Sequence, residues 1–115
     1  SENISYINAH GTSTIKGDEI ELNAISKLFN HNIFVSSTKS SIGHLLGAAG
    51  SVEAIFSILS LNHNVLPATL NLDDPIESKN LNLIPKNPIE KKINYTLSNS
   101  FGFGGTNTAL LFKSI

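Results

Sequence analysis

The chain has 115 residues, of which 40% are apolar and 15% charged, and its formal net charge is −1. This composition is that of one globular domain, which at this length buries roughly two-thirds of its unfolded surface. The chain has no cysteine, which excludes a disulfide framework and a thiolate metal site within it, and it lacks the basic blocks typical of nucleic-acid or anionic-membrane binding.

The first part of the chain alternates predicted strands and helices. Apolar residues predict buried strands over 4–9 and 32–37. Between them a helix is predicted from Gly17-Asp18 to Asn30, with an apolar face made of Ile20, Ala24, Ile25, Leu28 and Phe29. The segment 45–61 is apolar on nearly every side, which predicts a helix enclosed by other protein.

The second part is punctuated by four prolines, and in it only residues 81–84 read as a strand before the final pair. Strong strand candidates over 94–100 and 106–112 flank the sequence FGFGG and predict an antiparallel pair. The order β-α-β-α-β-β predicts a layered α/β domain with a mixed sheet. The apolar helix lacks enough sheet to cover it, so we expect a piece of a larger fold.

Glu53 interrupts the longest apolar stretch, together with several serines. This argues against a membrane span, and no basic region precedes a hydrophobic core at the N-terminus, so we expect a soluble chain. A carboxylate in such a helix is costly unless it is paired or bound to a cation, and we favour that arrangement over a solvated one. No ligand spacing typical of zinc is present.

Two histidines, His10 and His44, follow the predicted strands 4–9 and 32–37. Open α/β sheets place ligands at the carboxyl ends of their strands, so we expect the two to converge. A lone histidine is more often structural, but two at equivalent junctions favour function. Lys39 would disfavour a protonated imidazole nearby, which suits neutral hydrogen-bond donors that stabilise an enolate or oxyanion.

Two further stretches, one rich in hydroxyl side chains and one rich in glycine, each allow two interpretations of their role. Thr12, Ser13 and Thr14 either satisfy turn amides or hold a polar ligand arm. The glycines of FGFGG either form a tight turn with positive φ or let the loop move and its backbone approach a ligand.

Four motifs run in order through essentially the whole chain: NAHGTST…GD, SSTKSSIGHLLGAAGSVEAI, LPATLNLDDP and LSNSFGFGGTN. With them the chain resembles the C-terminal half of a β-ketoacyl-[acyl-carrier-protein] synthase, synthase II above all. The resemblance implies the thiolase-like fold, whose two similar halves share a five-layered α/β/α/β/α core. Residues 1–115 would be the C-terminal domain, without the cysteine-bearing N-terminal half.

The resemblance also implies a reaction, the decarboxylative Claisen condensation of an acyl thioester with malonyl-acyl carrier protein at a Cys-His-His site. His10 and His44 would donate hydrogen bonds to the malonyl thioester carbonyl, and Lys39 would tune their electrostatic environment. Thr12 and Thr14 would bind the phosphopantetheine arm of the carrier protein. One departure from the family is Ile15-Lys16, where relatives often have a proline, and it bears only on the shape of the local loop.

The resemblance gives the FGFGG segment a part in the same site. Phe103 would be a gate whose backbone amide completes an oxyanion hole, Phe101 would line the site, and Gly102 and Gly104 would permit the movement. The positions that in some relatives bind a structural monovalent cation correspond to Asn8, Glu53, Ser98 and Asn99.

The nucleophilic cysteine of the family belongs to the N-terminal half, so this chain alone is expected to be inactive. The implied partners are the acyl carrier protein, the N-terminal half and a second subunit in a homodimer, with no nucleic acid and no membrane. No cofactor is implied beyond the carrier's phosphopantetheine and the cation, and the expected location is the cytoplasm or, in a eukaryote, an organelle. Three alternatives remain: a polyketide synthase ketosynthase domain, a non-catalytic partner of chain-length-factor type, and a decayed remnant.

Overall fold

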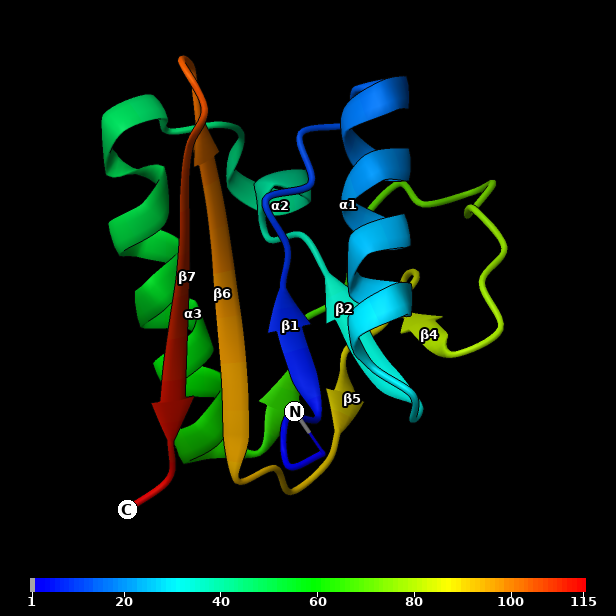
Figure 1. Cartoon of the computed structure of the whole chain (residues 1–115). Coiled ribbons are helices and arrows are strands. Elements are labelled where there is room, and N and C mark those ends of the chain that lie inside the picture. The colour runs from blue at the N-terminus through cyan, green and yellow to red at the C-terminus, as the bar shows by residue number, and fades with distance from the viewer. Residues whose placement is uncertain (1) are drawn as a thin grey trace.

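The computed structural model describes residues 2–115, and its framework is a five-stranded sheet with helices on both faces (Figure 1). The strand order is β4-β2-β1-β6-β7, in which the first four strands are parallel and β7 runs antiparallel to β6. The bounds are β1 (Tyr6–Asn8), β2 (Ile33–Ser36), β4 (Leu81–Leu83), β6 (Tyr95–Gly102) and β7 (Thr106–Lys113). The predicted mixed sheet and its closing antiparallel pair are confirmed.

Two long helices cover opposite faces of this sheet, α1 (Ile15–Leu28) and α3 (Ala49–His63). One core cluster joins α1 to β1, β2 and β4 through residues such as Ile7, Ile25 and Val35. The other lies on the α3 side and includes Tyr6 and Leu61. Adjacent residues of β1 therefore serve opposite cores, as expected for a central strand.

Four short elements were not predicted: α2 (Lys39–Ile42), the 3₁₀ turn η1 (Leu46–Ala48), β3 (Val65–Leu66) and β5 (Ile89–Glu90). The strands β3 and β5 pair with each other outside the main sheet. Because η1 precedes α3, the regular helix begins at Ala49 and not at Leu45.

The apolar face predicted for α1 is partly wrong. Ile25 and Phe29 are buried, but Ile20 and Leu28 are 68% and 64% exposed, and Ala24 is exposed too. The buried line of the helix steps by four residues through positions 21, 25 and 29, which leaves positions 20, 24 and 28 just outside it. This line buries a carboxylate, that of Glu21, in place of a further apolar side chain.

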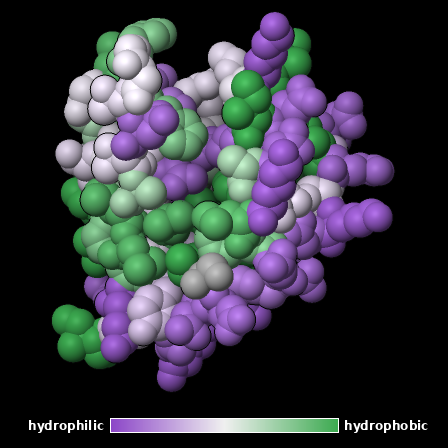
Figure 2. Space-filling model, viewed as in Figure 1, coloured by the Kyte–Doolittle hydropathy of each residue, from purple (hydrophilic) through white to green (hydrophobic). Residues whose placement is uncertain are grey.

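The helix α3 is covered on one side only within this chain. It turns Glu53, Ser57 and Leu61 toward the sheet, whereas Ile55 and Ile58 are 55% and 40% exposed. In the view of Figure 2, apolar side chains also gather over β6 and β7, on a face that no helix of the described residues covers. No helix within residues 2–115 has the length and apolar character that crossing a bilayer requires.

Candidate active site

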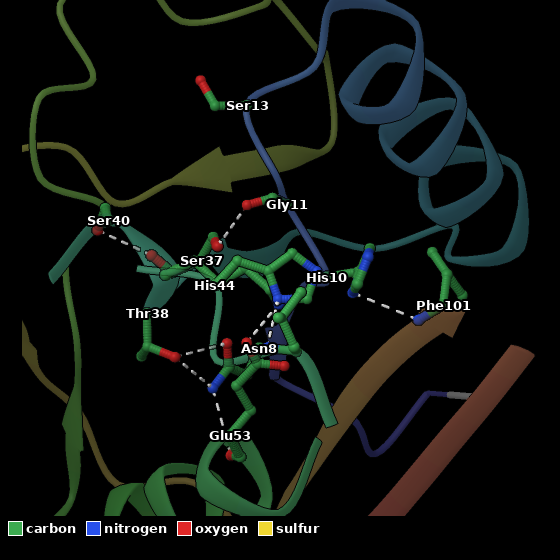
Figure 3. Close-up of polar contacts among 12 residues, drawn as sticks. Asn8, His10, Gly11, Ser13, Ser37, Thr38, Ser40, His44, Glu53 and Phe101 are labelled. Atoms are coloured by element: carbon green, nitrogen blue, oxygen red, sulfur yellow. Dashed lines mark hydrogen bonds and ion pairs between the residues drawn. The ribbon is translucent and has the colours of Figure 1, made fainter. Parts of the chain in front are cut away.

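The two histidines lie side by side at one edge of the sheet (Figure 3). His10 follows β1, and His44 follows β2 after the short helix α2. Because β1 and β2 are adjacent and parallel, the segments that follow them leave the sheet at the same edge. The two ring centroids are 5.6 Å apart, with the rings nearly perpendicular. The predicted convergence is confirmed.

Backbone amides fix the proton positions of both rings. The N–H of Phe101 donates to Nδ1 of His10 at 3.3 Å, and the N–H of Leu46 donates to Nδ1 of His44 at 3.1 Å. A neutral imidazole that accepts at Nδ1 carries its proton at Nε2. Both histidines are therefore held as Nε2–H donors, the form that can stabilise a developing oxyanion.

The surroundings of His10 keep its ring neutral. Burial lowers its pKa, the positive charge of Lys39 and the neighbouring His44 lower it further, and Asp18 opposes them. The expectation that Lys39 disfavours a protonated imidazole is confirmed for His10.

Lys39 is the first residue of α2 and forms a buried ion pair with Glu53 of α3. Their side chains are only 5% and 1% exposed. The prediction that Glu53 is paired is therefore confirmed. Its second oxygen, Oε2, has no hydrogen-bond partner among residues 2–115, so the carboxylate keeps one buried acceptor for a further ligand.

Glu21 is a site residue that the sequence did not reveal. Its two carboxylate oxygens accept the backbone N–H groups of His10 and Gly11, each at 2.9 Å, and Oε1 also accepts from Nδ2 of Asn99. The carboxylate holds the turn that carries His10. The one sequence feature that points to Glu21 is its position four residues before Ile25, which places it on the buried side of α1. A search for periodic apolar residues misses it because Glu21 is charged.

The hydroxyls of Thr12 and Thr14 lie 3.3 Å apart at the start of α1. Thr14 is the N-cap residue of the helix, yet its side chain makes no capping hydrogen bond, which favours the ligand interpretation over turn satisfaction. Gly17 makes room for this arrangement, because a Cβ there would lie 2.3 Å from Oγ1 of Thr14. Ile15 occupies the first helical position, where proline is also favoured, so the departure from the family pattern leaves the helix start intact.

The two phenylalanines of the β6–β7 hairpin lie in different surroundings. The ring centroid of Phe101 is 5.3 Å from that of His10, so Phe101 belongs to the site. Phe103 lies in the exposed turn of the hairpin. Gly104 and Gly105 have φ of 79° and 82°, as predicted for glycines that form a tight turn with positive φ. Gly102 lies in β6 and does not have a positive φ.

The four residues predicted to bind a cation are all buried, but their side chains divide between two faces of the sheet. Nδ2 of Asn8 donates to the backbone carbonyl of Glu53, and Ser98 pairs in register with Asn8 on that side. Asn99 follows Ser98 and turns its side chain to Glu21 on the α1 side. Within the described part of the chain, no three His, Cys, Asp or Glu side chains form a group that could hold a metal ion.

The sequence of the chain matches known proteins of one family. Residues 1–73 match the beta-ketoacyl synthase C-terminal domain. Over 113 residues the chain is 55% identical to 3-oxoacyl-[acyl-carrier-protein] synthase 2 of Rhizobium meliloti, covering 96% of this chain and 27% of that protein. It is 50% identical to the mitochondrial 3-oxoacyl-[acyl-carrier-protein] synthase of Arabidopsis thaliana, covering 97% of this chain and 26% of that protein.

Solved structures of the same family have the same fold as this chain. A β-ketoacyl synthase from Burkholderia phymatum superposes with a TM-score of 0.91 at 41% identity, covering 98% of this chain and 28% of that one. The ishigamide ketosynthase/chain length factor gives 0.92 at 30% identity, with the same coverage. The expected thiolase-like fold is thereby confirmed, and the chain spans about a quarter of the length of these relatives. The chain belongs to the β-ketoacyl synthase family and corresponds to the C-terminal part of its members.

Proposed function

We propose that this chain is the histidine-bearing part of a 3-oxoacyl-[acyl-carrier-protein] synthase that elongates fatty acids. The observation that carries the proposal is the pair of Nε2–H donors, His10 and His44, fixed at one edge of the sheet by backbone amides. Relatives at 55% and 50% identity with that name support the substrate class.

In the proposed reaction, the bond between Cα and the carboxylate of the malonyl thioester breaks and carbon dioxide leaves. The electron pair moves into an enolate whose negative charge resides largely on the thioester oxygen. Two fixed neutral donors stabilise that oxygen without reorganising as the charge develops. The enolate carbon then attacks an acyl group held as a thioester on the cysteine of the missing part, and the cysteine thiolate leaves.

Other residues take supporting roles in this proposal. The charge of Lys39 adds to burial in keeping His10 neutral. The hydroxyls of Thr12 and Thr14, which lie within hydrogen-bond distance of each other, bind the phosphopantetheine arm of the carrier protein. Phe101 lines the site beside His10. We expect Phe103 to act as a gate, its movement allowed by the flanking Gly102 and Gly104 and its amide facing the acyl carbonyl when it closes. Gly104→Val should therefore slow condensation more than acyl loading, and equal slowing of both steps would argue against a gate.

A structural monovalent cation fits the unpartnered oxygen of Glu53. Glu53, Asn8 and Ser98 would hold it from the α3 side, and Asn99 would contribute only through its backbone. The ion would give Oε2 of Glu53 a ligand and order the polar groups around it. Replacing tetramethylammonium chloride by potassium chloride at equal ionic strength should then stabilise the enzyme by about 1 kcal/mol, measured by urea unfolding. Equal stability in the two salts would exclude the cation.

The uncovered apolar surfaces of α3 and of β6–β7 support the N-terminal part of the synthase as the partner that completes the fold. A structural relative is described as a ketosynthase in complex with its acyl-carrier protein, and we propose that this chain likewise serves a carrier-dependent, homodimeric enzyme. The relatives include bacterial and mitochondrial synthases, so we propose the cytoplasm or an organelle as its location.

A second candidate is a non-catalytic partner, because the ishigamide relative includes a chain length factor. The arrangement of His10, Lys39 and His44 argues against it, since a partner that only binds has no use for two oriented histidines with a depressed pKa at one of them.

The test is a synthase chimera in which residues 1–115 replace the matching segment of the Rhizobium meliloti relative. The chimera is supplied with acyl- and malonyl-carrier protein, and the products are followed by mass spectrometry. We expect a condensation product that is two carbons longer. A folded chimera that loads the acyl group but forms no such product would favour the non-catalytic candidate.

A further inference from the structure

The hydroxyl of Ser37 connects the turn that carries His10 to the segment that carries Lys39 and His44. Its Oγ donates to the carbonyl of Gly11 at 2.8 Å (Figure 3). Gly11 directly follows His10, and Ser37 lies two residues before Lys39. The bond therefore joins the two loops just where each leaves the sheet.

The packing around this bond is tight. A Cβ at Gly11 would lie 2.6 Å from Cβ of Ser37, and Gly11 has a φ of 38°, so the two backbones approach more closely than any residue but glycine at position 11 would allow. The amides of His10 and Gly11 are held from the other side by Glu21. The turn is thus fixed by its N–H groups on the α1 side and by a carbonyl on the β2 side.

Ser37 is itself anchored through its backbone. Its N–H donates to Oγ1 of Thr69 at 3.0 Å, and its carbonyl accepts from Oγ of Ser40 at 2.8 Å. The Ser40 hydroxyl in turn accepts the N–H of Leu70 at 2.9 Å. A loop distant in sequence therefore immobilises Ser37, so that its hydroxyl transmits a fixed position to the His10 turn.

We infer that Ser37 is a positioning residue that sets the geometry between the two histidines. Both Nε2–H groups must reach one thioester oxygen, so a small displacement of either loop weakens the stabilisation of the enolate. The Thr38 hydroxyl, which hydrogen-bonds to the side chain of Asn8, is a second link between the two strands and limits the effect to a partial one. The inference rests on the proposed function.

The test is Ser37→Ala in the synthase chimera. Malonyl decarboxylation without an acyl primer should slow about tenfold, whereas acyl loading onto the cysteine should stay within about twofold. A purely structural role would lower both rates together. Ser37→Cys fills the same space with a much weaker donor and serves if the alanine variant does not fold.

Ser60→Ala is the matched control. Ser60 is also buried, and its hydroxyl donates to a backbone carbonyl, that of Phe56, at 2.9 Å, but it lies in α3 away from both histidines. We expect Ser60→Ala to leave decarboxylation unchanged and to alter the unfolding midpoint little, because alanine forms helices better than serine and the lost bond lies within one helix.

His10→Ala, measured in parallel, separates the two hypotheses. If His10→Ala abolishes decarboxylation and Ser37→Ala keeps the unsubstituted ratio of decarboxylation to loading, the positioning role is wrong and the proposed function stands. If His10→Ala itself decarboxylates normally, the proposed function fails.

Discussion

Replacing His10 or His44 with alanine is expected to abolish malonyl decarboxylation in the synthase chimera, with a loss of at least about 100-fold in kcat for each variant. Each substitution removes one of two neutral donors from the oxygen on which the enolate charge develops. The rings are 5.6 Å apart. In the proposed mechanism both donate to the same oxygen, so the remaining donor does not substitute for the missing one. Release of carbon dioxide from malonyl-carrier protein, followed by mass spectrometry of the carrier, gives the rate.

His31→Ala is the matched control for these variants. His31 is half-buried, and its Nε2 is hydrogen-bonded to the carbonyl of Ile4 at 2.8 Å, and among residues 2–115 no hydrogen bond links it to the site. This variant should decarboxylate at the unsubstituted rate and lose only stability. Near-normal decarboxylation in both the His10 and the His44 variants would contradict the role proposed for the pair.

The convergence of the two histidines could be predicted because it follows from a local rule. Parallel neighbouring strands end at the same edge of a sheet, so residues that follow them meet whatever the rest of the fold does. The pairing of Glu53 could also be predicted, because an unpaired carboxylate in so apolar a helix is too unfavourable to persist. The sequence predicts that its partner, Lys39, lies near the histidines, and the structure shows that Lys39 pairs with Glu53 while its charge also lowers the pKa of His10.

Glu21 could not be found in this way, because its role depends on where α1 packs. The helix buries positions spaced by four residues, and whether the line passes through Ile20 or Glu21 depends on a rotation of the helix of about 100° per residue. The contact of Glu21 with the turn after β1 provides the hydrogen bonds that make burial of a carboxylate tolerable. The pattern of apolar residues predicts neither the rotation of α1 nor the hydrogen bonds of Glu21.

The division of the cation residues was equally hidden. Ser98 and Asn99 are adjacent in β6, so their side chains must lie on opposite faces of the sheet. The motif groups them by sequence, whereas the sheet separates them. The strands β3 and β5 were missed for a related reason, since each has only two residues and exists through pairing with a distant segment.

The ion pair between Lys39 and Glu53 should produce the largest stability effect in the molecule. Lys39→Met or Glu53→Gln alone leaves one uncompensated charge in a site that is almost fully buried. Breaking a buried pair in this way typically lowers the free energy of unfolding by about 3–5 kcal/mol. The double variant Lys39→Met/Glu53→Gln removes both charges together and should recover most of that loss. Urea unfolding of the chimera measures all four proteins, and a double variant no more stable than either single one would contradict this account.

The same double variant separates the stabilising role of Lys39 from its electrostatic one. The positive charge of Lys39 helps to lower the pKa of His10, so its removal lets that pKa rise toward the ordinary value of about 6.5. His10 then becomes protonated at a higher pH and loses its neutral form sooner as the pH falls. The acid limb of the decarboxylation profile should therefore move to higher pH in a protein that remains folded. An unchanged acid limb would mean that burial alone keeps His10 neutral and that Lys39 serves the fold through Glu53.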